Sequence, residues 1–81
     1  MRKPDALKLL GERIATLRHS RGLTQEQLAE RMGMSRNHIA DIELGARNTG
    51  VWSFLLVAHA LEMDAADLFA DFSAAAVRRL R

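Results

Sequence analysis

Hydrophobic side chains recur at helical spacing along most of the chain, and no segment shows the alternation of a β-strand. Leu28, Ala29 and Met32 form one apolar stripe, and Ile39 and Ile42 form another in the segment that follows. These stripes predict two short helices that are joined by a tight turn.

The residues around these stripes carry start and stop signals. Thr24 precedes the first helix, with Gln27 three residues later in the pattern of a capping box. Gly33 falls where that helix must end, and Ser35 can cap the next one. Because Ala29 is small, the two helices can approach closely and cross steeply. This geometry predicts a helix-turn-helix, whose second helix enters the major groove of DNA.

Three further helices are expected outside the helix-turn-helix of residues 25–44. The first runs from Pro4 to about Gly22, the fourth covers about 51–62, and Asp64 caps the fifth. Their inward faces are expected to consist of Leu7, Leu10, Ile14 and Leu17, then Val51, Phe54, Ala58 and Leu61, then Leu68 and Phe69. Without a strand candidate, repeat or linker, the chain is expected to form a single all-α domain of five helices spanning all 81 residues.

Composition places the chain among folded globular proteins, with 48% hydrophobic and 27% charged residues. It has no cysteine, so disulfides and thiolate metal sites are excluded. No apolar run is long enough to span a membrane, and the N-terminus lacks the apolar core of a signal peptide. We therefore expect a cytoplasmic protein without membrane contact.

The distribution of charge says more than the net charge of +2. Residues 1–50 carry nine Lys and Arg against six Asp and Glu, whereas residues 51–81 carry three against four. The half with the helix-turn-helix is thus net positive, as expected if that end faces phosphate.

Catalytic and metal sites are not indicated by the spacing of the polar residues. His19, His38 and His59 are far apart, and no HExxH pair or strand-linked glycine-rich phosphate loop is present. We expect a protein that is not an enzyme and that uses no cofactor, no metal and no small-molecule ligand.

From Leu10 to about Phe69, the sequence resembles the Cro-like, or xenobiotic-response-element, helix-turn-helix family of bacterial and phage repressors. The matching segments are LGERI, Arg18 with Gly22-Leu23-Thr24-Gln25, LAERMGMS, IADIELGARN, and AHAL before Leu68-Phe69. Within that family, IELGARNT followed by a short helical tail most resembles the controller proteins of restriction-modification systems. The resemblance implies a lambda-repressor-like fold.

The resemblance also implies base contacts, because the N-terminal part of the family's recognition helix meets base edges. It places Arg36, Asn37 and Asp41 at the DNA. Arginine can bond bidentately to guanine, asparagine can bond to adenine, and a carboxylate can accept from the cytosine amino group. Asp41 lies four residues after Asn37, so an alternative is that it only orients that amide. The other alternative is that all three are solvated.

Contacts to the DNA backbone are expected from the rim of the motif, namely from Gln25, Ser35, His38, Arg47, Asn48 and Arg21. Gln25 starts a helix, where its side chain and nearby N–H groups can hold a phosphate. The alternative is that the loop residues are solvated and Ser35 is only a cap. For Arg18 and Glu43, the family pattern implies a structural ion pair between the first helix and the recognition helix.

A dimer interface is expected in residues 51–80, where the chain departs from the family. Trp52 and Leu56 replace usual polar residues on the side away from the expected core. Residues 73–81 either extend the fifth helix or form a separate last turn. A further apolar set at helical spacing consists of Phe69, Phe72, Ala76 and Leu80. A twofold dimer would set two recognition helices about 34 Å apart. The alternative is that the C-terminal helix covers Trp52 within one subunit.

These features together predict a transcriptional regulator that binds an inverted-repeat operator as a homodimer and is controlled by its own concentration. It would repress by covering a promoter, or activate by touching RNA polymerase. An alternative is an antitoxin-type interaction module, whose Trp52 surface holds another protein. A helical domain without DNA binding is disfavoured by Arg36 and Asn37.

Overall fold

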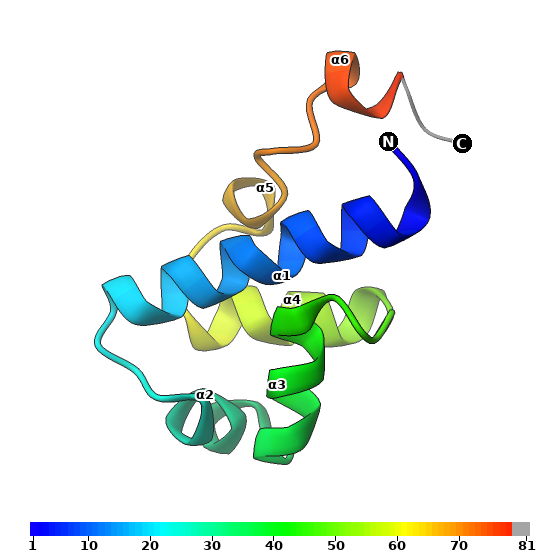
Figure 1. The fold of residues 1–81 in the computed structure, drawn as a ribbon. Coiled ribbons are helices and arrows are strands. Elements are labelled where there is room, and N and C mark those ends of the chain that lie inside the picture. The colour runs from blue at the N-terminus through cyan, green and yellow to red at the C-terminus, as the bar shows by residue number, and fades with distance from the viewer. Residues whose placement is uncertain (79–81) are drawn as a thin grey trace.

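A computed structural model describes residues 1–78, which form six α-helices and no β-strand (Figure 1). The helices are α1 (Lys3–Ser20), α2 (Gln25–Met32), α3 (Arg36–Leu44), α4 (Val51–Ala60), α5 (Ala65–Leu68) and α6 (Ala74–Val77). The all-α class is confirmed. There are six helices among these residues, where five were expected, because the tail forms a separate helix.

The predicted ends of α2 and α3 are present in the structure. The Gln27 N–H donates to Thr24 Oγ1 at 3.1 Å, and the Thr24 N–H donates to Gln27 Oε1 at 2.8 Å. Gly33 ends α2 in the left-handed conformation, with φ at +66°, and the Ser35 hydroxyl accepts the His38 N–H at 3.2 Å. Each signal thus acts at the residue where the sequence places it.

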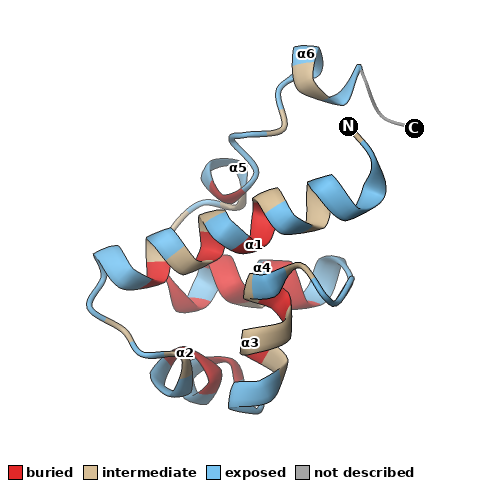
Figure 2. Ribbon diagram, in the orientation of Figure 1, coloured by how far each residue is buried: buried red, intermediate tan, exposed pale blue. Residues whose placement is uncertain are grey.

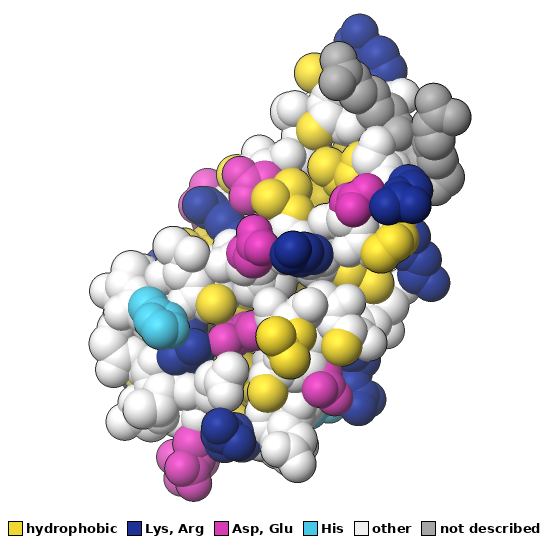
Figure 3. All heavy atoms as spheres, viewed as in Figure 1, with side chains coloured by type: hydrophobic (Ala, Val, Ile, Leu, Met, Phe, Trp, Pro, Cys, Tyr) yellow, Lys and Arg dark blue, Asp and Glu magenta, His cyan; other side chains and the backbone are white. Residues whose placement is uncertain are grey.

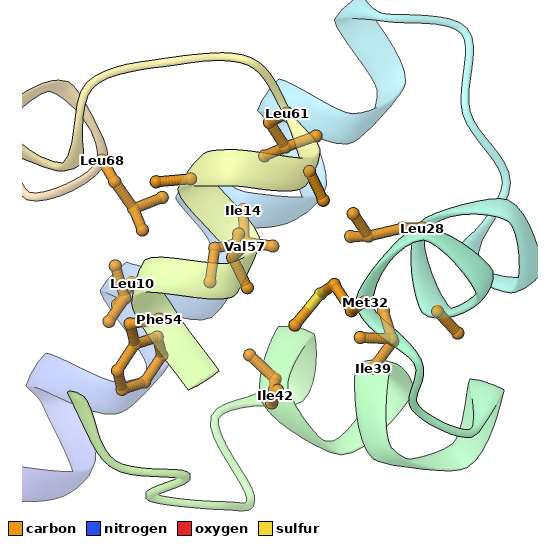
Figure 4. Close-up of a cluster of buried hydrophobic side chains, with 13 residues drawn as sticks. Leu10, Ile14, Leu28, Met32, Ile39, Ile42, Phe54, Val57, Leu61 and Leu68 are labelled. Carbon is orange, nitrogen blue, oxygen red and sulfur yellow. The ribbon is translucent and has the colours of Figure 1, made fainter. Parts of the chain in front are cut away.

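A single hydrophobic core is assembled from α1 to α5 (Figure 4). Its members are Leu10, Ile14, Leu28, Ala29, Met32, Ile39, Ile42, Phe54, Val57, Ala58, Ala60, Leu61 and Leu68. Each fully buried leucine or isoleucine contributes about 2 kcal/mol to the stability of the fold, far more than an exposed ion pair does. In contrast, α6 has no buried residue (Figure 2).

Helix α3 lies directly on the backbone of α1. A Cβ added at Gly11 would lie 2.5 Å from the carbonyl oxygens of both Ile42 and Glu43. Gly45, just after α3, has φ at +74°, and a Cβ there would lie 2.7 Å from Lys8 Cα. One side of α3 is therefore fixed against α1, which leaves the other side to face outward.

The helices are arranged so that α2 and α3 form one end of the molecule and α6 projects from the other (Figure 1). The principal extents are 35 × 23 × 21 Å.

At the start of α1, the Arg2 N–H donates to Asp5 Oδ2 at 3.2 Å, and this bond lowers the pKa of the Asp5 carboxyl. Within residues 1–78, no helix has both the length and the apolar character needed to cross a membrane.

The orientation of α4 differs from the prediction at two positions. Phe54, Ala58 and Leu61 are buried as expected, but Val51 is 75% exposed because it lies in the first turn, beyond the core. Leu56, which was expected to face outward, is half-buried and packs on the core. The buried face of α4 is wider than the inward face that was predicted, because Ser53 and Ala60 are also buried. Leu56 lies three residues after Ser53 and four before Ala60, so it is on the same side of the helix as both.

The C-terminal tail does not continue one helix, so the expected helical row of apolar side chains is wrong. The chain leaves α5 after Leu68, and Phe69 packs edge-on against Phe54, with ring centroids 5.9 Å apart. Phe72 packs on the core of its own chain, 6.2 Å from Phe69 between ring centroids. Ala76 is half-buried in α6, whereas Leu80 lies outside the described residues.

Candidate nucleic-acid interface

The outward side of α3 is polar at its N-terminal end. Ile39 and Ile42 face the core, and Asn37, Ala40 and Asp41 lie toward the opposite side of the helix. Arg36 and Asn37, in the first turn, are both exposed. The sequence-predicted base-contacting pair is therefore free to meet a ligand from outside.

Asp41 lies one turn further along α3 and is paired with Arg47 of the following loop. Arg47 Nη2 donates to Asp41 Oδ2 at 3.4 Å, and both side chains are almost half exposed. The structure thus brings Asp41 to Arg47 rather than to Asn37. A pair this exposed stabilises the fold by well under about 1 kcal/mol, so its main effect is on where Arg47 lies.

The loop of residues 45–50 is held to α3 by a second contact. His38 Nε2 lies 2.8 Å from Thr49 Oγ1. Asn48, between the two tethered loop residues, is exposed. Consequently Arg47 and Asn48, which the sequence predicts at the DNA backbone, lie on a loop that contacts α3 at two places.

Arg18 and Glu43 form the expected ion pair between α1 and α3. Arg18 Nε donates to Glu43 Oε2 at 2.7 Å and Arg18 Nη2 donates to Oε1 at 3.0 Å. The two side chains are only 9% and 6% exposed. Breaking such a buried pair by removing one partner typically costs about 3–5 kcal/mol.

The sequence did not reveal that Gln25 shares this carboxylate. Gln25 Nε2 donates to Glu43 Oε1 at 3.0 Å, across 18 residues of sequence. Nothing in the spacing of single residues indicates such a contact, because it depends on how α2 and α3 cross. Gln25, which was predicted to contact phosphate, and the Arg18–Glu43 pair thus belong to one hydrogen-bonded network.

Arg21 is the predicted contact residue that the structure places elsewhere. Arg21 Nε donates to the Leu61 carbonyl oxygen at 2.6 Å, at the C-terminal end of α4. There it lines a polar hollow together with Arg31, His59 and Glu62. A cation at a helix C-terminus is favourable, which explains this position without DNA.

The exposed hydrophobic side chains of α4 lie on one face. Val51, Trp52 and Leu55 are 75%, 72% and 43% exposed, and Leu55 follows Val51 by four residues and Trp52 by three. We call these three residues the α4 patch. On the face shown in Figure 3, other hydrophobic side chains gather over α5 and the segment leading to α6, and acidic and basic side chains are interspersed.

Comparisons with known proteins agree with the fold and with the predicted family. The sequence profile of a helix-turn-helix domain matches residues 9–70. The chain is 38% identical over 64 residues to y4dJ, an uncharacterized HTH-type transcriptional regulator of Sinorhizobium fredii, covering 79% of this chain and 83% of that one.

Solved structures of restriction-modification controller proteins have the same fold. C.AhdI of Aeromonas hydrophila superposes with a TM-score of 0.79 at 35% identity, covering 82% of this chain and 96% of that one. C.Esp1396I, solved as a tetramer in complex with its natural 35 base-pair operator, superposes with a TM-score of 0.75 at 30% identity, covering 82% and 87%. The chain belongs to the helix-turn-helix domain family and is a transcriptional regulator of the controller and repressor type.

Proposed function

We propose that this protein binds an inverted-repeat operator in the cytoplasm as a homodimer and regulates its own transcription. The observation that carries the proposal is the outward side of α3, where the exposed Arg36 and Asn37 are followed by a loop tethered at Thr49 and Arg47. The operator complex of C.Esp1396I supports it, since that relative has the same fold.

Sequence would be read by Arg36 and Asn37 in the major groove. Their side chains match the guanine and adenine edges respectively, and each good bidentate pair discriminates by about 1–3 kcal/mol. We keep Asp41 among the base-contacting residues, with a second role. Its carboxylate holds Arg47 near the groove until a phosphate competes for the guanidinium.

The DNA backbone would be held on both sides of α3 by Gln25, Ser35, His38, Arg47 and Asn48. Gln25 lies at the N-terminus of α2, where the helix dipole favours an anion. Arg47 and Asn48 lie on the tethered loop after α3. Arg21 is left out of this set because its guanidinium caps α4.

The α4 patch would form the dimer contact. Trp52 is the largest exposed apolar side chain in the described residues, and buried tryptophans often dominate interface energies. Phe69, at 37% exposure, can extend the contact, whereas Leu56 and Phe72 pack on their own core. Because operator occupancy then depends on protein concentration, a dimer without a ligand can regulate itself. A bound dimer would repress by covering a promoter and activate by contact with RNA polymerase.

The decisive experiment is selection of bound sequences from a random duplex pool at physiological salt. We expect an inverted repeat whose half-sites are about one helical turn apart. A folded protein that enriches no sequence would contradict the proposal. That result would favour the antitoxin-type alternative, in which the exposed Trp52 binds another protein.

A further inference from the structure

Three helices meet at the carboxylate of Glu43. Its Oε2 accepts from Arg18 Nε of α1 at 2.7 Å. Its Oε1 accepts two bonds of 3.0 Å, one from Arg18 Nη2 and one from Gln25 Nε2 of α2. A carboxylate has room for all three, since each oxygen offers two lone pairs.

The fold itself does not require the bond from Gln25. Arg18 already contacts both oxygens of Glu43 and neutralises the charge, and its Nη1 donates further to the Leu23 carbonyl at 2.7 Å. A buried carboxylate held by a bidentate arginine is satisfied. The third bond therefore constrains Gln25 more than it stabilises Glu43.

Gln25 is the first residue of α2, at the helix end where an anion would bind. The backbone N–H groups of a first turn point out of the N-terminal end. Thr24 Oγ1 accepts the N–H of Gln27, so the N–H groups of Gln25 and Glu26 remain at the open end. The Gln25 side-chain amide has two N–H donors, of which Glu43 takes one.

We propose that Glu43 is a positioning residue for DNA binding, whose carboxylate fixes the Gln25 amide so that its second N–H donates to a phosphate oxygen. This inference rests on the proposed function. A free glutamine side chain loses rotamer freedom when it binds, and the bond to Glu43 removes that freedom before DNA arrives. Arg18 keeps the carboxylate from repelling the phosphate.

The test is the effect of Gln25→Ala on operator affinity in two backgrounds. One background is the natural chain and the other is the double variant Arg18→Met/Glu43→Met, because apolar replacement of a whole buried pair often leaves a fold intact. We expect Gln25→Ala to weaken binding about tenfold in the natural chain and less than about twofold in the double variant. Equal losses in both backgrounds would overturn the positioning role.

Arg36→Ala is the matched control, since Arg36 lies on the outward side of α3 and should lose the same factor in both backgrounds. Thermal unfolding by circular dichroism establishes that each variant is folded. A natural chain that binds no duplex overturns both proposals. A natural chain that binds the operator but is indifferent to Gln25→Ala overturns only the role of Glu43.

A second measurement uses the natural chain alone, in case the double variant does not fold. Gln27 of the same helix provides an internal reference. Its side chain accepts a hydrogen bond through the carbonyl oxygen, and the residue is exposed, so its amide hydrogens can exchange with water. We expect one Gln25 side-chain hydrogen to exchange with water at least about tenfold more slowly than those of Gln27. On addition of operator, the second should become protected as well. Exchange equal to that of Gln27, or a second hydrogen that stays unprotected, would overturn the inference.

Discussion

Gly11 of α1 lies against the backbone of Glu43 in α3, so closely that a Cβ on Gly11 would be 2.5 Å from the Glu43 carbonyl oxygen. No side-chain movement can relieve such a contact, because the atoms that a Cβ would meet belong to the backbone of α3. The contact between the first helix and the recognition helix therefore depends on a missing methyl group.

Gly11→Ala is expected to destabilise the protein by about 3 kcal/mol, since α1 and α3 must separate to admit the methyl group. This is the reverse of the usual gain of up to about 1 kcal/mol from replacing glycine inside a helix. Urea unfolding measures the change. Thr16→Ala, at an exposed position of the same helix, should stay within about 0.5 kcal/mol. A stabilised Gly11→Ala variant would contradict the close packing.

Glu62→Gly is expected to stabilise the protein by about 1 kcal/mol. Glu62 follows the end of α4 with φ at +55°, a conformation that costs a residue with a side chain about that much. The turn also contains a bond from the Met63 N–H to the Ala58 carbonyl at 3.0 Å, typical of a helix end that favours glycine. The thermal midpoint should rise for Glu62→Gly but not for Glu62→Ala; equal midpoints would argue against backbone strain.

Arg36→Ala is expected to weaken operator binding about ten- to hundredfold while hardly changing the affinity for random duplex. An arginine that reads guanine contributes to discrimination between sequences, whereas one on phosphate weakens all sequences alike. Competition fluorescence anisotropy at fixed salt gives both affinities. Arg21→Ala is the matched control, and it should leave operator binding nearly unchanged because Arg21 caps α4. Equal losses of affinity on both duplexes would indicate that Arg36 contacts the DNA backbone and not a base.

Trp52→Ala is expected to weaken the dimer about thirtyfold, as the loss of an interface hot spot of about 2 kcal/mol implies. Sedimentation equilibrium measures this directly. Leu56→Ala provides the contrast, because Leu56 packs on the core and its truncation should lower the unfolding free energy instead. If Trp52→Ala leaves the dimer unchanged, the interface lies on another surface.

The caps of α2 and α3 were predicted well because their signals are local, whereas Asp64 stands at the N-cap of α5 without a side-chain cap bond. Thr24, Gln27, Gly33 and Ser35 act within three or four residues of themselves, so no knowledge of packing is needed. The Arg18–Glu43 pair came from the family pattern, and the structure contains it.

The features that were missed depend on how helices cross. Eight of the ten residues of α4 are hydrophobic, so hydrophobicity alone does not show which side is buried, and the polar Ser53 lies on the buried side. Arg21 meets a carbonyl 40 residues away, and Gln25 meets Glu43 only because α2 and α3 cross there. A break after Leu68 divides what the spacing presented as one continuous row.

Helices α3 and α4 both pack into one hydrophobic core, and Thr49 of the loop between them is hydrogen bonded to His38 of α3, so α3 and the α4 patch are rigidly connected. In the proposed dimer, this stiffness would fix the angle between the two reading helices. One base pair inserted between the half-sites turns the second one by about 35° around the DNA axis. A flexible linker would absorb that rotation, but this loop would not. The regulator should therefore discriminate operators by the length of their spacer as well as by the bases it touches.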